Sequence, residues 1–357
     1  MENKILLESH NIKNLFSGFG QFNYWLLRNL AKKNNRYEFT ALAKNKKSIT
    51  ELGESFHFKK YYGFQRYSQL RIREKFNIWH SLNQNSKIEP YHEMPYLLTI
   101  HDVIFIEKEK PQDVDQKQFE HLKQKIERSD YLVFISQYAK DSTNKYFKIP
   151  PSIPQKVIYN GNPVQRKDAI SNIPENAINP SKPFLFCIGQ FLEMKNFHSL
   201  IPFLAKLKDY DLVIAGNNDK PYRSVVEKEI EKHGLQDRVK LPGKISETEK
   251  HYYLQHCAAF VFPSLHEGFG LPPIEAMAYG KPVFLANRTS LPEIGGEVAF
   301  YWENFEPDDM LKVFENGMDL YESDKVGFQA RLEERAAFFD WEKTASQYLE
   351  VYAQILN

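Results

Sequence analysis

The sequence predicts an α/β protein made of two doubly wound, Rossmann-like domains, and three observations lead to this class. At 357 residues, the chain exceeds one ordinary core and suits two domains of roughly 150 to 180 residues each. Short β-rich runs alternate with longer helical patterns, as in parallel sheets with crossover helices. This alternation lapses once, in a polar stretch over 161–182, and then begins again.

The first half predicts a parallel sheet. Strands are expected at 4–8, 37–43, 78–81, 96–102, 131–136 and 156–160. After Gly161 the run PVQRKDAISNIPENAINPSKP is rich in Pro, Asn, Ser and Lys, which is typical of a connection between folding units. We therefore expect an N-terminal domain over 1–165.

The second half predicts another sheet of the same kind. Strands are expected at 183–189, 210–216, 239–243, 258–264, 282–287 and 298–302. The C-terminal domain should cover 166–340. In the last segment Trp341, Ala345, Tyr348 and Tyr352 are three and four residues apart, which predicts an amphipathic helix over 341–357 that packs back on the first domain.

Composition excludes some classes of function. Lys plus Arg number 47 against 46 Asp plus Glu, a net charge of +1, so the chain lacks the positive charge that nucleic-acid binding normally uses. Cys187 and Cys257 lie in apolar runs without metal-ligand spacing, as structural thiols in a reducing compartment do. No stretch approaches the roughly 20 apolar residues of a membrane span. We expect a cytoplasmic protein that lies at most against the inner face of the membrane.

A basic and aromatic segment covers 57–75. Its cations are Lys59, Lys60, Arg66, Arg71, Arg73 and Lys75. Such a segment can contact anionic lipid headgroups or a lipid-linked acceptor, or it can be a solvated face. The expectation is at most weak peripheral membrane contact.

The segment 267–275 has the pattern of a strand, a glycine turn and a helix. After the strand AAFVFPS, Gly268 and Gly270 permit a tight turn and the prolines of LPPIE suit the first helical turn. Backbone N–H groups at such a helix start favour a phosphate or a sugar oxygen. Glu267 and Glu275 flank this position, so that one could hold a sugar diol and the other a ribose diol. The alternative is a core helix whose two glutamates face solvent.

This segment resembles the retaining glycosyltransferases of family four, the group 1 glycosyltransferases, in their mannosyltransferase-like branch. The resemblance rests on two glutamates separated by GFGLPPI and followed by AMAYGKPV. It implies the GT-B architecture, two Rossmann-like domains that face each other across a cleft. It also implies that Glu267 contacts hexose hydroxyls and Glu275 the ribose. The implied backbone contacts to the sugar and diphosphate are those of Gly268, Phe269, Gly270 and Leu271.

Two further segments of the second half fit a donor site. Gly189 and Lys195 follow a strand, and a lysine there can give a point charge to a diphosphate. In the resembling family the residue after this glycine is often arginine, whereas this chain has Gln190, a departure that weakens the site. Arg288 could replace that charge or could be an ordinary surface residue. Ser290 and Leu291, in a loop that resembles the family's diphosphate-side loop, could offer backbone donors.

The first half contributes a glycine loop and a histidine. Gly18 and Gly20 follow the first strand and resemble the family's SGIG-type loop, although a strand-to-helix turn needs glycine anyway. His101 ends a strand, and the resemblance implies that it faces the cleft near the sugar, whereas packing is the alternative. His101 and Glu267 are the candidate catalytic residues. Ser136 and Asn160 are candidate cleft residues without a derived role.

The resemblance implies the transfer, with retention, of a hexose such as mannose or glucose from a nucleotide-diphosphate sugar. GDP-mannose and UDP-hexoses are the first candidate donors, and the acceptor would be a glycan or a lipid-linked glycan in polysaccharide assembly. The resemblance also implies transfer without a metal ion, and no cofactor is expected. It is consistent with this that no Asp-x-Asp pair follows a strand, since Asp308 with Asp309 suits a helix cap.

Other classes were weighed against this interpretation. A dinucleotide-dependent oxidoreductase is disfavoured, because Asn23 stands where the third glycine would be and the second strand ends without an acidic residue. A sugar phosphorylase or a nucleotide-sugar epimerase on the same scaffold stays open as the alternative.

Overall fold

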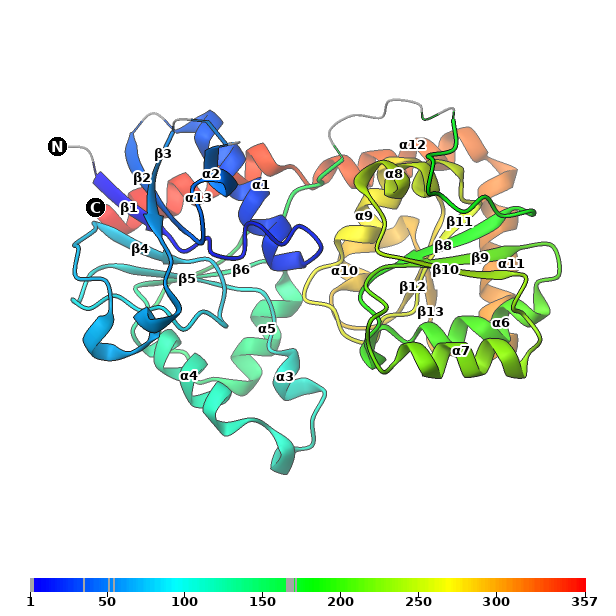
Figure 1. Ribbon diagram of the computed structural model, residues 1–357, viewed down its shortest axis with the longest axis horizontal. Helices are drawn as coiled ribbons and strands as arrows, with labels where there is room; N and C mark the ends of the chain where they lie inside the picture. Colours follow the sequence, from blue (N-terminus) through cyan, green and yellow to red (C-terminus); the bar gives the residue numbers. More distant parts are fainter. Residues whose placement is uncertain (1–2, 35, 51, 54, 165–169, 171) are drawn as a thin grey trace. The chain divides into compact units, whose positions relative to one another are not determined.

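The computed structural model describes residues 3–34, 36–50, 52–53, 55–164, 170 and 172–357. The chain divides into two compact units, which we call unit 1 (Met1–Gly161 with Asp340–Asn357) and unit 2 (Asn162–Phe339) (Figure 1). The backbone therefore passes between the units twice, near the expected divisions at 165/166 and 340/341.

Unit 1 is built on a seven-stranded sheet in the order β3-β2-β1-β4-β5-β6-β7. Every neighbouring pair is parallel. The strands are β1 Asn3–Leu7, β2 Tyr37–Ala43, β3 Phe56–Lys60, β4 Ile78–Ser81, β5 Tyr96–Ile100, β6 Tyr131–Phe134 and β7 Gln155–Val157. The order of the first six is that of a doubly wound fold, in which the strand sequence reverses direction between β1 and β4.

The helices of unit 1 include one from the end of the chain. Its described helices are α1 Gly18–Lys33, α2 Lys47–Thr50, α3 Ile104–Glu107, α4 Gln116–Glu127, α5 Gln137–Tyr146 and α13 Trp341–Leu356. The helix α13, red in Figure 1, packs on α1. Trp341, Ala345, Tyr348 and Tyr352 are all buried, so the spacing that predicted an amphipathic closing helix is confirmed.

Unit 2 repeats the same topology in a six-stranded sheet with the order β10-β9-β8-β11-β12-β13. All its neighbouring pairs are parallel. The strands are β8 Phe184–Ile188, β9 Asp211–Ala215, β10 Val239–Gly243, β11 Ala259–Phe262, β12 Val283–Ala286 and β13 Phe300–Trp302. The described helices are α6 Leu200–Lys206, α7 Arg223–Lys232, α8 Glu247–His256, α9 Leu271–Ala278, α10 Leu291–Gly295, α11 Pro307–Ser323 and α12 Lys325–Phe338. The predicted class of two doubly wound sheets is confirmed.

One strand escaped prediction. The strand β3, Phe56–Lys60, pairs in parallel with β2 and begins in the segment that its charge and aromatic content had marked as a basic surface. Two short 3-10 turns follow it, Gly63–Arg66 and Ser68–Leu70. Tyr62, Phe64, Tyr67 and Leu70 are 41 to 52% exposed there, so this region combines a sheet edge with an exposed aromatic surface.

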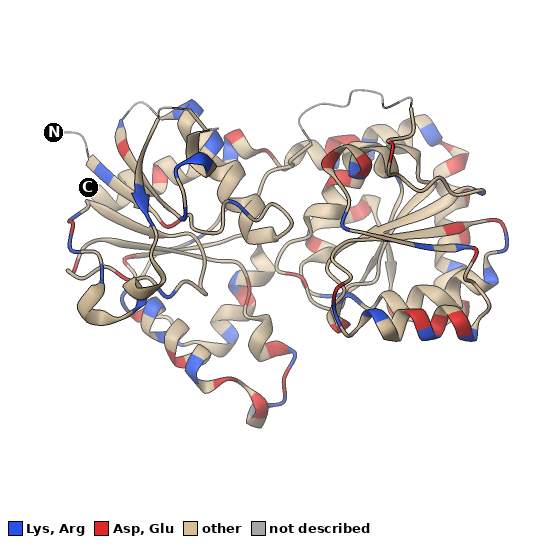
Figure 2. Ribbon diagram, in the orientation of Figure 1, with Lys and Arg blue, Asp and Glu red and all other residues tan. Residues whose placement is uncertain are grey.

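Charges of both signs are interspersed over each unit (Figure 2), which agrees with the balanced composition. Within the described ranges, no helix combines the length and the apolar composition that a bilayer crossing requires.

Candidate functional site

The candidate site of unit 2 lies where its strand order reverses. In open parallel sheets, ligands bind beyond the carboxyl ends of the strands at this point, which in unit 2 falls between the neighbouring strands β8 and β11. The loop after β8 carries Gly189 and Lys195, and the loop after β11 carries Glu267 to Gly270. The topology thus explains why segments more than seventy residues apart meet.

An ion pair joins the two loops. The Nζ of Lys195 donates to Oε1 of Glu267, and the two side chains are only 14% and 15% exposed. Nζ also lies 5.3 Å from the ring centroid of Phe262, at the end of β11. A Cβ added to Gly189 would lie 3.3 Å from Cζ of Phe197, which is a tight approach, and 3.6 Å from Cε of Lys195, which is an ordinary van der Waals contact. The sequence had assigned the two charges to different parts of the ligand and had not predicted their pairing.

The turn after Glu267 is held by the loop that follows β12. The backbone N–H of Glu267 donates to Oγ1 of Thr289 at 3.0 Å. The buried Ser290 hydroxyl donates to the carbonyl oxygens of Glu267, at 2.9 Å, and Phe269, at 2.6 Å. Ser290 therefore positions the glutamate turn through its side chain, a role different from the backbone donor expected.

Gly270 and Leu291 fix the start of α9. Gly270 caps the helix with φ at +123°, a conformation that only glycine adopts without strain. A Cβ there would lie 3.1 Å from Cδ2 of the buried Leu291. The Leu291 N–H donates to the carbonyl of Arg288 at 3.1 Å. The expectation of an open donor at Leu291 is thereby corrected, because its N–H is engaged and its side chain supports the turn.

The remaining turn residues have different environments. Gly268 lies within the turn and is partly exposed. Phe269 is 4% exposed and packs edge-on against Phe339, with ring centroids 5.6 Å apart. The side chain of Phe269 is thus part of the core, which leaves its backbone as the part that could contact a ligand.

Glu275 is a buried ion-pair partner. It lies on α9 and is 5% exposed, and its Oε1 accepts from Nζ of Lys250, on α8, at 2.7 Å. Lys250 also pairs with Glu247 at 2.8 Å. Burial raises the pKa of Glu275, and Lys250 opposes that effect. Burial would lower the pKa of Lys250, but Glu275 and Glu247 together raise it, so the ammonium stays charged.

This environment changes the interpretation of Glu275. The alternative of two solvent-facing glutamates does not hold, since Glu267 and Glu275 are both paired. Lys250 was not among the residues chosen from the sequence. No sequence pattern pointed to it, because α8 buries Lys250, Tyr252, Tyr253 and Leu254 without a regular apolar stripe.

The structure brings together the two unit 1 candidates. Gly20 follows Ser17, the N-cap of α1, whose hydroxyl accepts from the Gly20 N–H at 3.1 Å. A Cβ on Gly20 would lie 1.9 Å from the Asn14 carbonyl oxygen, so glycine is needed for this close approach, whereas Gly18 has open space. The ring of Phe19, between them, contacts the ring of His101 edge-on at 4.8 Å.

His101 has the geometry of a neutral imidazole. Its Nε2 lies 2.9 Å from the Leu82 carbonyl oxygen, which can only accept, so Nε2 carries a proton and Nδ1 is left as an acceptor. Burial lowers the pKa of His101 to about 4.

Two buried histidines predict a loss of stability in acid. Burial lowers the pKa of His80 to about 3 and that of His101 to about 4, so between pH 6.5 and these values only the unfolded chain binds the protons. Stability should therefore fall as pH drops below 6.5, by about 2 kcal/mol per histidine at pH 5. Urea unfolding at pH 7 and pH 5 measures this. In His80→Gln the loss of unfolding free energy between pH 7 and pH 5 should be smaller than in wild type. An unchanged loss would contradict the assignment of this pH dependence to His80.

Several weaker candidates have structural contacts. Arg288 donates to the carbonyl of Glu303 at 2.9 Å. Its guanidinium is therefore engaged in a surface contact, and no contact that the structure describes assigns it the role of the arginine that Gln190 replaces. Ser136 accepts from the Ala139 N–H at 3.0 Å as the N-cap of α5. The buried Oδ1 of Asn160 has no hydrogen-bond partner. Among the described residues, no group of His, Cys, Asp or Glu side chains is arranged to hold a metal ion.

Comparison with known proteins defines the class. The whole chain superimposes on sucrose-phosphate synthase from Thermosynechococcus elongatus with a TM-score of 0.75 at 17% identity, covering 99% of each chain. It also matches HepE of Anabaena, solved in complex with UDP and glucose, with a TM-score of 0.70 at 17% identity, covering 99% of this chain and 100% of that one. These likenesses confirm the predicted GT-B fold class.

The family follows from the sequence match. Residues 168–327 match the family described as "Glycosyl transferases group 1", a range that contains all the unit 2 candidates above. Over this range, the resemblance to the group 1 glycosyltransferases stated from the sequence is confirmed.

Two similar curated proteins are named as mannosyltransferases. "Serotype-specific mannosyltransferase WbdA" of Escherichia coli is 27% identical over 250 residues, 65% of this chain, and the match spans only 30% of that protein. "O-antigen chain mannosyltransferase RfbU" of Salmonella typhimurium is 28% identical over 257 residues, 70% of this chain and 67% of that protein.

Proposed function

We propose that the protein is a retaining hexosyltransferase, which moves a hexose from a nucleotide-diphosphate sugar to a glycan or lipid-linked glycan acceptor. The observation that carries this proposal is the Lys195–Glu267 ion pair at the switch point of unit 2, within the segment that matches the group 1 glycosyltransferases. The relatives named as mannosyltransferases favour mannose, and the neighbour solved with UDP and glucose favours a UDP-hexose.

The chemistry requires opposite charges side by side. Breaking the anomeric bond builds negative charge on the diphosphate leaving group and positive charge at the anomeric carbon. In our proposal the Lys195 ammonium, aimed by Glu267, stabilises the departing diphosphate through its remaining N–H donors. The second carboxylate oxygen of Glu267 accepts from a hexose hydroxyl. Both groups are preorganised by their mutual contact and by the Thr289 and Ser290 hydrogen bonds.

The other candidates have supporting parts in the proposal. The backbone N–H groups of the turn from Gly268 to Leu271 would contact the donor. The carboxylate oxygen of Glu275 that is not bonded to Lys250 would accept a hydrogen bond from a ribose hydroxyl. His101 would accept a hydrogen bond at Nδ1 from a sugar hydroxyl. Independence from a metal ion also belongs to the proposal.

A thermal-shift screen tests the donor site directly. GDP, UDP, ADP and their sugar conjugates are added without metal, since a ligand at about 100 times its dissociation constant stabilises the fold by roughly 2.7 kcal/mol. One nucleotide should shift the melting temperature clearly, and Glu267→Gln should keep most of a free nucleotide's shift while losing the extra shift of the sugar conjugate. No shift by any nucleotide would reject the proposal. Product analysis then separates transfer from a phosphorylase, which needs inorganic phosphate, and from an epimerase, which needs no acceptor.

The exposed aromatic side chains of 57–75 support a further part of the proposal, weak contact of unit 1 with an anionic membrane surface on the cytoplasmic side. Tyr62 and Phe64 stack on each other at 5.1 Å, and the Lys60 ammonium lies 5.0 Å from the Tyr62 ring. Aromatic rings beside lysines are typical of interfacial segments. Cosedimentation with vesicles that is independent of anionic lipid would reject this contact.

A further inference from the structure

Unit 1 contains a cavity of about 490 Å³ that the donor site does not use. Three separate segments line it: the turns after β3, the loop after β4, and the C-terminal half of α4. The lining side chains belong to Arg66, Tyr67, Arg71, Lys87, Glu89, His121, Gln124, Lys125 and Arg128. Five of them are Lys or Arg and one is acidic.

The single carboxylate of the cavity is fully engaged. Glu89 accepts from the Arg128 guanidinium at 2.5 Å and lies 3.7 Å from Nζ of Lys125. Arg66 interacts with Tyr67, through a hydrogen bond of 2.9 Å to its hydroxyl. Within the part of the chain that the structure describes, Arg71 and Lys87 have no carboxylate at ion-pair distance, and Nε of Arg71 is buried without a hydrogen-bond partner. The cavity therefore keeps an excess of positive charge.

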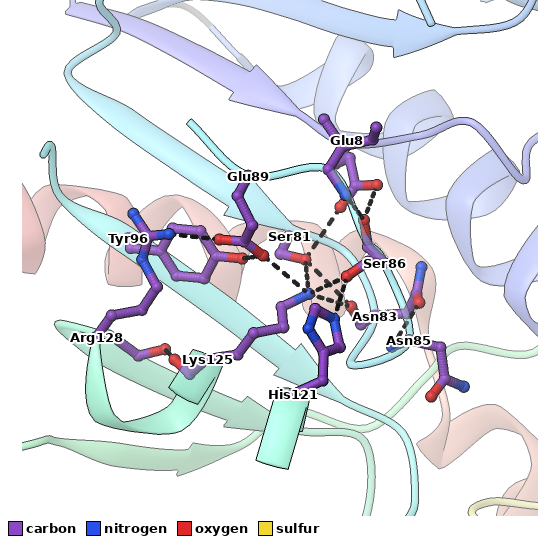
Figure 3. A network of polar contacts seen from close by, with 12 residues as sticks. Glu8, Ser81, Asn83, Asn85, Ser86, Glu89, Tyr96, His121, Lys125 and Arg128 are labelled. Carbon is purple, nitrogen blue, oxygen red and sulfur yellow. Dashed lines mark hydrogen bonds and ion pairs between the residues drawn. The ribbon is translucent and has the colours of Figure 1, made fainter. Parts of the chain in front are cut away.

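Two of the cations are held rigidly. Lys125 is 1% exposed, and its Nζ donates to Oγ of Ser81 at 2.9 Å and to the carbonyls of Ser86 at 3.1 Å and Asn83 at 3.3 Å. These three bonds engage its three N–H groups, so Lys125 contributes charge to the cavity, and the donors come from the other cations. The Arg128 guanidinium lies 4.7 Å from the ring centroid of Tyr96. Figure 3 shows Lys125 and Arg128 converging on Glu89 from α4, with His121 beside them. Fixed charges of this kind lose little side-chain entropy when an anion binds nearby.

The chemistry and the volume define the class of ligand. Guanidinium groups and lysines together recognise phosphate oxygens, and the cavity falls within the roughly 300 to 1,000 Å³ range of small-molecule sites, well beyond the size of one inorganic phosphate. Tyr67, at the cavity wall, could pack against an attached sugar ring. The donor's diphosphate already has Lys195 in unit 2, so a second phosphate site suits a different substrate.

We propose that this cavity binds a phosphate or diphosphate ester of a sugar, the anionic group of the acceptor. The acceptor role rests on the proposed transferase function, whereas the binding of the anion does not. The same phosphate chemistry occurs in phospholipid headgroups, and the experiment separates the two sources.

The test is a calorimetric titration of the full chain with inorganic pyrophosphate, in saturating UDP or GDP so that the donor site is filled. Wild type should bind one pyrophosphate. Arg71→Gln/Lys87→Gln should weaken binding at least about tenfold, because each charge-assisted contact contributes about 1.5–3 kcal/mol. As a control, Lys117→Gln/Lys123→Gln removes two positive charges from exposed positions of α4 outside the cavity and should bind like wild type.

The outcomes are distinct. Absence of pyrophosphate binding, or equal affinity in wild type and the double variant, overturns the proposal. Binding to phosphatidylglycerol vesicles but not to pyrophosphate also overturns it, in favour of a lipid surface. Should the double variant not fold, the exposed Lys87→Gln alone carries the same comparison with a smaller loss. If no nucleotide shifts the melting temperature of wild type, the transferase function is rejected. The pyrophosphate titration still tests whether the cavity binds an anion.

Discussion

Replacing Glu275 by alanine is expected to lower the free energy of unfolding of unit 2 by about 3 kcal/mol, at the lower end of the range for a broken buried ion pair. The change leaves the buried Lys250 ammonium without its 2.7 Å partner. Glu247 offsets only part of the loss, because its side chain is 62% exposed. Chemical denaturation followed by hydrogen exchange of the β11 and β12 amides measures the effect.

A double variant distinguishes the loss of the ion pair from the loss of helix packing. Lys250→Met with Glu275→Met replaces both charges by apolar groups of similar volume, which is often neutral or stabilising. It should recover most of the stability and still bind nucleotide poorly if Glu275 holds the ribose. A loss in Glu275→Ala within the roughly 0.5 kcal/mol of an ordinary surface substitution would show that the pair contributes little.

Replacing Lys195 by methionine is expected to lower kcat for sugar transfer by about 10²- to 10³-fold, as the removal of one preorganised donor to a developing anion does. The methionine keeps the length of the side chain beside Phe262 and removes the charge. It also frees Glu267 from its ion pair, so the orientation of the hexose should suffer as well. Steady-state kinetics with the donor identified by the thermal-shift screen measure the loss.

A lysine elsewhere in unit 2 provides the control. Lys206 ends α6 and pairs with Asp308 at 2.7 Å on the surface, so Lys206→Met removes the same charge from the same unit without touching the site. Its kinetics should match those of wild type. Equal activity of Lys195→Met and Lys206→Met would show that Lys195 does not stabilise the departing diphosphate.

The sequence predicted the sheets better where strands are apolar than where they are not. The runs AAFVFPS and PVFLAN contain β11, AFVF, and β12, VFLA, because buried parallel strands need continuous apolar residues. The edge strand β3, FHFKK, has an exposed face, and its lysines resemble those of a surface loop. Only the pairing with β2 identifies it as a strand, and such a long-range contact cannot be read from local composition.

The assignment of the candidate site residues to a donor stays a prediction, and the contacts between these residues were not predicted. Glycine turns after apolar runs identified the loops of Lys195 and Glu267, because carboxyl ends of neighbouring parallel strands meet. The ion pair between them depends on rotamers, and the Lys250–Glu275 pair depends on how α8 packs against α9. Ser290 was selected for its backbone, whereas its hydroxyl makes the contacts. Local sequence patterns therefore do not predict which side chains from different helices and loops pair with each other.

The double passage of the backbone between the units has a consequence for biosynthesis. Unit 2 is a single continuous segment, whereas unit 1 lacks α13 until residues 340–357 are made. The Tyr352 hydroxyl of that helix hydrogen-bonds the buried His80 at 2.8 Å. Until α13 is synthesised, the core of unit 1 therefore lacks the side chains that this helix contributes. At roughly 5–20 residues per second, this wait lasts on the order of ten seconds or more. The later-synthesised unit can therefore complete its fold first, and the emerging first unit is the part of the nascent chain that most needs protection by chaperones.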